Sequence, residues 1–113
     1  MMTQDTPAEA WENYKNMVQD VCSNEEATLR SLFLDVKSSA ARPDEALSTD
    51  VGYWFIDSAI RESSVPAARE RARRAFCDHG LGAMFEEKND RLKSELRELV
   101  KRTYRSCWKN KAD

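Results

Sequence analysis

The sequence predicts an all-α fold: a small bundle of four to five helices with a long, partly projecting C-terminal helix. Three observations support this fold class. The 113 residues include only three glycines and three prolines, and strong helix formers are abundant. Apolar residues recur every three to four positions along most of the chain. A chain of this length is expected to form a single domain, residues 1–113, with a flexible tail over residues 1–5.

The N-terminal part predicts two helices arranged as an antiparallel hairpin. Thr6 can cap the first helix, and Glu9 can return the capping hydrogen bond. A second capping box, Ser23 to Glu26, predicts a new helix after a short turn. The expected inward faces are Trp11, Tyr14, Met17, Val18, Val21 and Cys22 in the first helix, and Leu29, Leu32, Phe33 and Val36 in the second.

A loop is predicted over residues 38–50, although Pro43 to Leu47 could form a helical turn. Ser48 or Thr49 is then expected to cap a third helix over residues 50–62. This helix has two apolar faces: one comprises Val51, Trp54, Phe55 and Ala59, and the other Tyr53, Ile56 and Ile60. Such a helix is central in a bundle or is covered by a partner, so a homodimer through residues 50–62 is one interpretation. Residues 52–56 would also suit a strand, but no second strand is available to pair with them.

The C-terminal half predicts two further helices. One begins near Ser63 and Pro66 and ends at His79, where Gly80 suits a left-handed stop. The other covers residues 83–109 and would be about 40 Å long, so its last turns are expected to project; whether it is broken near Asn89 is open. Its expected core face is Leu81, Phe85, Leu92, Leu96, Leu99, Val100 and Cys107.

Charge and cysteine content suggest the environment of the chain. The net charge is −2, but residues 1–65 carry −7 and residues 66–113 carry +5. The two halves could attract each other, or the basic half could meet an acidic partner. No apolar run reaches the roughly 20 residues of a membrane-spanning helix, and no secretory signal is recognisable. The three separated cysteines indicate free thiols in an intracellular, reducing compartment, most simply the cytoplasm.

Catalytic and metal-binding patterns are absent from the sequence, so we expect a protein that is not an enzyme and needs no cofactor or metal. Cys77 and the single histidine, His79, diverge by about 200° on a helix and cannot easily form a nucleophile–base pair. Cysteine and histidine spacing specifies no zinc site. Adjacent carboxylates on helices point apart and are typical of solvated faces. No phosphate-binding loop or hydrolase motif occurs.

The arginine-rich segment 69–80 does not form one basic patch on a helical wheel. Arg74 can pair with Glu70 and with Asp78, one turn away on either side. Arg69 and Arg73 are left as a basic edge beside the alanine-rich inward face. This edge is a secondary candidate for partner binding.

The last helix offers the stronger candidate surface. Before Glu98, local pairs such as Glu87–Arg91 can neutralise its charges, and Glu98 can pair with Arg102. After Glu98 no acidic residue appears until Asp113. A basic-aromatic stripe on this part of the helix is expected to bind a partner; its members are Arg97, Lys101, Tyr104, Arg105 and Trp108. The alternative is that cations are simply favoured near a helix C-terminus and that the aromatic residues border the core.

The leading functional prediction is therefore a non-enzymatic protein–protein interaction module: a small subunit, adaptor or inhibitor that docks through this stripe on an acidic or grooved protein. The alternative is a nucleic-acid-binding protein that uses the same stripe. The pI of about 5.5 counts against the alternative, because nucleic-acid-binding domains are usually basic. Leu34, off the core face of its helix, could join the apolar residues of the third helix in a further docking patch.

Overall fold

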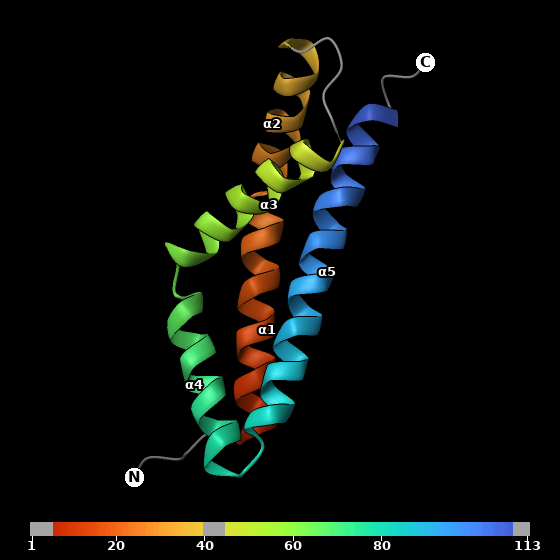
Figure 1. Cartoon of the computed structure of the whole chain (residues 1–113). Coiled ribbons are helices and arrows are strands. Elements are labelled where there is room, and N and C mark those ends of the chain that lie inside the picture. The colour runs from red at the N-terminus through yellow and green to blue at the C-terminus, as the bar shows by residue number, and fades with distance from the viewer. Residues whose placement is uncertain (1–5, 40–44, 110–113) are drawn as a thin grey trace.

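The computed structural model of the chain describes residues 6–39 and 45–109, and this part contains five α-helices and no strand (Figure 1). They are α1 (Pro7–Asn24), α2 (Glu26–Ser39), α3 (Glu45–Arg61), α4 (Val65–Asp78) and α5 (Gly82–Lys109). The predicted all-α bundle with a long C-terminal helix is confirmed. The flexible tail predicted for residues 1–5 lies outside the described residues. The molecule is elongated, with extents of 58 × 25 × 20 Å.

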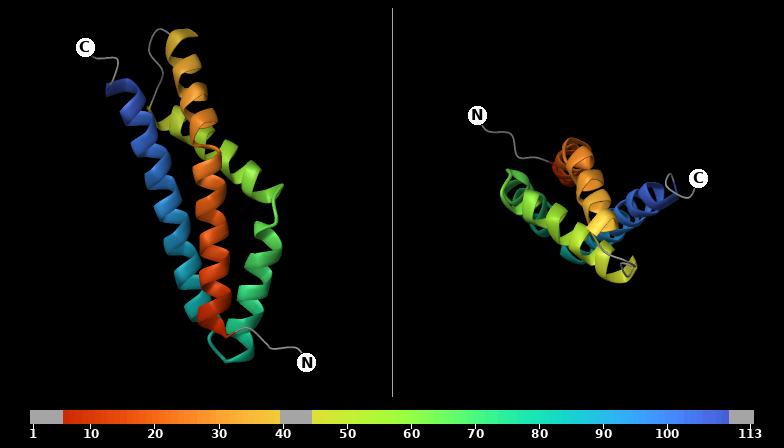
Figure 2. Two further views of the ribbon diagram at one scale, coloured as in Figure 1. Left: turned by 180° about the vertical axis from the view of Figure 1, so that it is seen from behind. Right: turned by 90° about the horizontal axis from the view of Figure 1, so that it is seen from above.

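Helices α1 and α2 follow one another end to end, instead of folding back as the predicted hairpin (Figures 1 and 2). The N-terminal capping box of Thr6 and Glu9 is present as predicted. No chain reversal follows at Ser23, because helical hydrogen bonding continues through Glu25. The Glu25 N–H donates to the Val21 carbonyl at 3.0 Å, and the Leu29 N–H donates to the Glu25 carbonyl at 2.9 Å. The two helices therefore present one long apolar stripe, whose buried members are Ala10, Tyr14, Val18, Cys22, Leu29 and Phe33.

Helix α3 crosses the upper part of the bundle diagonally (Figure 1). It begins at Glu45, so the expected loop over residues 38–50 is helical at both ends, and residues 40–44 lie outside the described residues. Ser48 and Thr49 are buried inside α3 and do not cap it. The early start fits the good helix formers Ala46 and Leu47, which outweigh the polar signal of the residues after them.

The connections on either side of α4 are closed by local hydrogen bonds. Ser63 Oγ donates to the Ile60 carbonyl at 2.6 Å and accepts from the Val65 N–H at 3.1 Å, which joins the end of α3 to the start of α4. At the other end Gly80 adopts φ 72°, as predicted. The N–H groups of Gly80 and Leu81 donate to the carbonyls of Cys77 and Phe76, the pattern of a Schellman motif.

Helix α5 is continuous through Asn89, and its 28 residues give a length of about 42 Å. The expected projection of its last turns is not observed as far as Cys107. Tyr104 packs edge-on against Phe33 of α2 with ring centroids 5.3 Å apart, and Cys107 is buried. The physical reason is the end-to-end arrangement of α1 and α2, which provides a neighbour for the full height of α5.

A buried polar pair lies in the lower core. Tyr14 Oη donates a hydrogen bond to Asn89 Oδ1 between α1 and α5, and both residues are buried. Burial also raises the pKa of Tyr14, so the hydroxyl remains a donor throughout the physiological range. Aromatic rings surround the pair: Phe85 and Trp11 pack on Tyr14, and Phe76 packs on both of them.

Removing this donor tests its contribution. Tyr14→Phe should lower the free energy of unfolding by about 1–3 kcal/mol, because it leaves the Asn89 side chain buried without this partner. Urea denaturation followed by circular dichroism measures the change. The double variant Tyr14→Phe/Asn89→Leu should recover part of the loss. Equal stability of wild type and Tyr14→Phe would contradict this role for the pair.

Gly52 marks the tightest contact at the crossing of α2, α3 and α5. A Cβ atom at this position would lie 2.6 Å from Phe33 Cζ and 3.0 Å from Val100 Cγ1, and both side chains are fully buried. We therefore expect Gly52→Ala to destabilise the fold by about 1–3 kcal/mol, although alanine is the better helix former.

Thermal unfolding shows which effect of Gly52→Ala dominates: the clash with its close neighbours or the higher helix propensity of alanine. The matched control is Gly82→Ala, whose nearest obstacle is the exposed Cys77 thiol at 3.3 Å, and its melting temperature should remain close to that of wild type. A rise in melting temperature for Gly52→Ala would show that propensity, and not contact, dominates at this position.

Candidate interaction surface

The first two residues of the predicted basic-aromatic stripe are engaged in contacts within the protein. The Arg97 guanidinium lies over the Tyr53 ring at 4.1 Å from the centroid, and its Nη1 lies 4.0 Å from Asp50 Oδ1. Arg97 therefore connects α5 to α3. Lys101 is half-buried and its Nζ lies 3.8 Å from Glu98 Oε2. Glu98 is thus the partner of Lys101, and the expected pair with Arg102 is not found.

The remaining residues of the stripe do not share one surface. Tyr104 is only 7% exposed, because it faces α2 and packs on Phe33. Its expected place on an accessible stripe is therefore not observed, and its burial matches the alternative that the aromatic residues border the core. Arg105 is exposed and has an interaction within the protein. Trp108 belongs to α5, but its side chain lies outside the described part of the chain.

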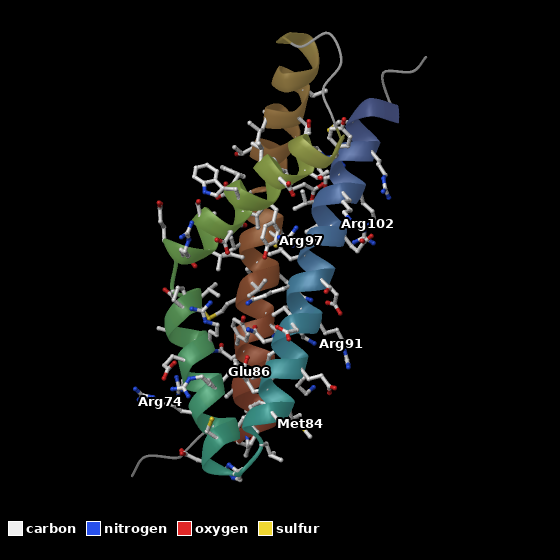
Figure 3. All side chains as sticks on the ribbon, viewed as in Figure 1. Arg74, Met84, Glu86, Arg91, Arg97 and Arg102 are labelled. Atoms are coloured by element: carbon white, nitrogen blue, oxygen red, sulfur yellow. The ribbon has the colours of Figure 1, made fainter. Side chains whose placement is uncertain are left out.

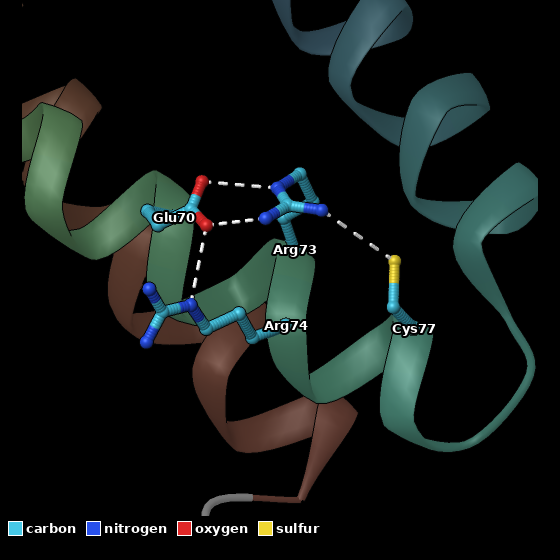
Figure 4. Close-up of polar contacts among 4 residues, drawn as sticks. All are labelled: Glu70, Arg73, Arg74 and Cys77. Carbon is cyan, nitrogen blue, oxygen red and sulfur yellow. Dashed lines mark hydrogen bonds and ion pairs between the residues drawn. The ribbon is translucent and has the colours of Figure 1, made fainter.

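The arginine-rich segment on α4 forms a compact ion-pair cluster (Figure 4). The Glu70 carboxylate binds Arg73 through both oxygens and Arg74 through Oε2 at 3.2 Å. The hydrogen bonds from Arg73, assisted by Arg74, lower the pKa of Glu70 to about 2. The predicted Glu70–Arg74 pair is confirmed. Arg73 is not left as a basic edge with the exposed Arg69, since it also binds Glu70 and lies 3.8 Å from the Cys77 sulfur.

Cys77 and His79 are separated in the way that the helical geometry predicts. Cys77 faces Arg73, whereas the His79 Nδ1–H donates to the Ala75 carbonyl at 2.9 Å and helps to close the end of α4. His79 is exposed, and does not share the inward face of α4 as the wheel suggests. Among the described residues, no group of three or more metal-ligating side chains is placed to hold a metal ion.

The position of α3 across the bundle determines which of its two apolar faces is buried. Ile56 and Ile60 are buried and Tyr53 is half-buried, so these residues belong to the core. The opposite face is the open one: Trp54 is 64% exposed and Val51 is 40% exposed. Leu34 on α2 is also exposed. The patch that the sequence suggested for Leu34 with Tyr53, Ile56 and Ile60 is therefore not formed.

A surface that the sequence did not reveal lies between the N-terminal helices and α5, which stand side by side (Figures 1 and 2). We call it the α1–α5 groove. Its upper part is a pocket of about 270 Å³ whose floor is apolar, with Val18, Cys22 and Ile56 facing Leu92 and Leu96. A second hollow of about 150 Å³ shares Leu92 and Glu95 with this pocket. A third, of about 610 Å³ at the base, shares Trp11 and Lys88 with the second.

The shared lining residues place the three hollows next to one another in a row along α1 and α5. The base of the groove is apolar and partly exposed, with Met84, Leu81 and the half-buried Trp11 around it. Its walls are helices, so the backbone polar groups along them are already paired. A groove of this kind can accept apolar side chains of another molecule without any rearrangement of the backbone.

Polar side chains form the two rims of the α1–α5 groove. On the α1 side, Glu12 pairs with Lys15 at 2.9 Å. Glu26, at the start of α2, pairs with Arg30 at 3.2 Å. On the α5 side Lys88 lies over the Trp11 ring, 5.4 Å from its centroid. Arg91 and Arg102 extend from α5 on the side away from α3 and α4 (Figure 3).

The thiol in the floor of the groove is chemically inert. Cys22 is only 7% exposed, and burial raises its pKa to about 11. The thiolate, which is the nucleophile, is therefore scarce at neutral pH.

Comparison of the chain with protein-family models, with curated proteins and with solved structures finds no significant match in any of the three. Within the described ranges, none of the helices has the length and apolar character required to cross a membrane.

Burial of the thiols leads to a testable order of reactivity. At pH 8 iodoacetamide should modify the exposed Cys77 of the native protein first, whereas Cys22 and Cys107, which are buried, should react only after unfolding. Mass spectrometry of the alkylated peptides gives the order. Because the folded-state pKa of Cys22 is raised, its contribution to stability is present below pH 9 and declines as the pH rises towards 11. Rapid modification of Cys22 in the native protein at pH 8 would contradict its burial.

Proposed function

We propose that this chain is a non-enzymatic protein–protein interaction module that binds a partner protein in the α1–α5 groove. The observation that carries the proposal is the row of three adjoining hollows along one side of two long helices, with an apolar floor and charged rims. An apolar centre enclosed by a polar rim is the usual anatomy of a protein interface. The role would be that of a small subunit, adaptor or inhibitor in a larger assembly.

Nucleic acid is the weaker candidate partner. A nucleic-acid surface needs unneutralised cations together with accessible aromatic rings for stacking. Arg97 is engaged by Asp50 and Tyr53, and Tyr104 is buried, so two residues of the predicted stripe are not available for that purpose. The rims of the groove carry both signs of charge, which favours a protein partner with charges of its own.

We also propose that the protein functions in a reducing, intracellular compartment. All three cysteines are free thiols. Two of them are buried at separate places: Cys22 lies in the middle of the bundle and Cys107 at the upper end of α5. Free buried thiols behave as small apolar side chains and need no oxidising environment.

A groove-blocking variant tests the proposed function. Gln19 is exposed on α1 and lines the 270 Å³ pocket, so Gln19→Trp places a larger, uncharged side chain over the pocket without removing a core residue. The matched control is Asn16→Trp, at an exposed position on the same helix that lines none of the three hollows. Circular dichroism should show that both variants are folded.

The readout is the set of proteins that co-purify with the tagged full-length chain from the native cell after nuclease treatment. We expect wild type and Asn16→Trp to retain the same partner protein and Gln19→Trp to lose it. Retention of the partner by Gln19→Trp would contradict binding in the groove. Loss of every co-purifying protein from wild type after nuclease treatment would instead indicate a nucleic-acid ligand.

A further inference from the structure

This inference rests on the proposed function of the groove. The charges on the α5 rim of the groove indicate the chemistry of the molecule that binds there. Arg102 lines the upper pocket and Arg91 lines the hollow below it. The two residues lie eleven positions apart on α5, which is about three helical turns or 16 Å. Both side chains are exposed and point to the same side of α5 (Figure 3).

The neighbouring carboxylates do not neutralise these two arginines. Glu12 is held by Lys15 and Glu26 by Arg30, so the acidic groups of the opposite rim already have partners. Within the part of the chain that the structure describes, neither Arg91 nor Arg102 forms an ion pair. Glu95 lies between them on the same rim. The groove therefore presents a cation at each end of its apolar upper pocket.

The shape of the groove favours a helical occupant. Its walls are two helices that stand side by side, and a further helix packs naturally between such walls by placing its side-chain ridges into their groove. An extended strand would require a free sheet edge, and the described residues form no strand. The apolar floor between Leu92 and Leu96 then receives side chains from one face of the incoming helix.

We propose that the α1–α5 groove binds an acidic amphipathic helix of a partner protein. An apolar anchor of that helix occupies the 270 Å³ pocket, and two carboxylates about three turns apart reach Arg91 and Arg102. The pocket provides most of the affinity, and the two ion pairs fix the register and direction of the helix. Glu95 adds specificity, because it repels a helix that places a carboxylate between these two positions.

The experiment uses the folded full-length chain and a displayed library of 20-residue amphipathic helices, randomised at the anchor and at the flanking positions. Selected sequences should contain Leu, Met or Phe at the anchor, with Asp or Glu at two positions eleven residues apart. The best peptide is then synthesised together with a version in which both acids are Lys. Fluorescence anisotropy should show the acidic peptide binding about tenfold more tightly than the Lys version at low salt.

Charge-reversal variants assign the binding to the rim. Arg102→Glu should remove or reverse the preference for the acidic peptide. Lys93→Glu, which changes the same charge on the same helix at an exposed position outside the groove, should leave the preference intact. The library selection should recover no anchored acidic helices on Gln19→Trp, whose added ring covers the pocket without changing its charge.

Several results would overturn this inference. Recovery of basic or uncharged helices, recovery of no helices, or equal effects of Arg102→Glu and Lys93→Glu would each show that the occupant is not an acidic helix held by these arginines. A doubled mass of the free chain that Gln19→Trp abolishes would identify a second copy as the occupant. These outcomes are distinguishable from failure of the proposed function, which is judged separately by groove-dependent capture of the native partner.

Discussion

The continuation of helical hydrogen bonding through Glu25 is the constraint on which the rest of the architecture depends. Because the chain does not reverse at this point, α1 and α2 together provide one long surface from Pro7 to Ser39. Helix α5 can then remain continuous over 28 residues and still bury its face as far as Cys107. A hairpin at the same place would have left the upper half of α5 without a neighbour.

The same constraint creates the groove. Helix α4 packs against α1 and α5 in the lower half of the bundle, and α3 crosses between α2 and α5 in the upper half. Helix α2 also packs directly on α5, whereas α1 touches α5 at few points, so the lower part of the N-terminal element is joined to α5 mainly through α4. On the other side, none of the five described helices fills the space between them, so the outer flanks of Trp11 and Leu99 remain half-buried. The apolar floor and the open side have one common cause, which is the placement of both shorter helices on the same side.

The sequence predicted the faces of the helices well and their connections less well. The inward residues of α1 and α5, the Thr6 cap and the Gly80 stop all follow from local periodicity and capping chemistry. The capping signal at Ser23 was misleading, because Cys22 and Leu29 lie seven positions apart and keep one stripe continuous across it. When tertiary packing extends a stripe in this way, a weak local stop signal does not end the helix.

The candidate site was less predictable for a related reason. A groove depends on the distance between two helices that are far apart in the sequence, and no periodicity reports that distance. The sequence also suggested the local ion pairs Glu87–Arg91 and Glu98–Arg102. Neither is among the ion pairs of the described residues, and Glu98 pairs with Lys101 instead. For Tyr104, a helical wheel cannot show that α2 extends far enough to cover it with Phe33.

The groove links binding to stability, because its floor is also the hydrophobic core. Val18, Cys22, Ile56, Leu92 and Leu96 are all buried in the free chain, and each contributes to the pocket. Truncating any of them would weaken the fold and the binding surface together. The rims are different: Gln19, Arg91 and Arg102 are exposed and make little contribution to the core. A ligand that binds only the folded form also raises its stability, by an amount that grows with the logarithm of the free ligand concentration once that concentration exceeds Kd. Affinity can therefore be altered at the rim without a change in the fold, whereas the floor keeps the groove preformed for its partner.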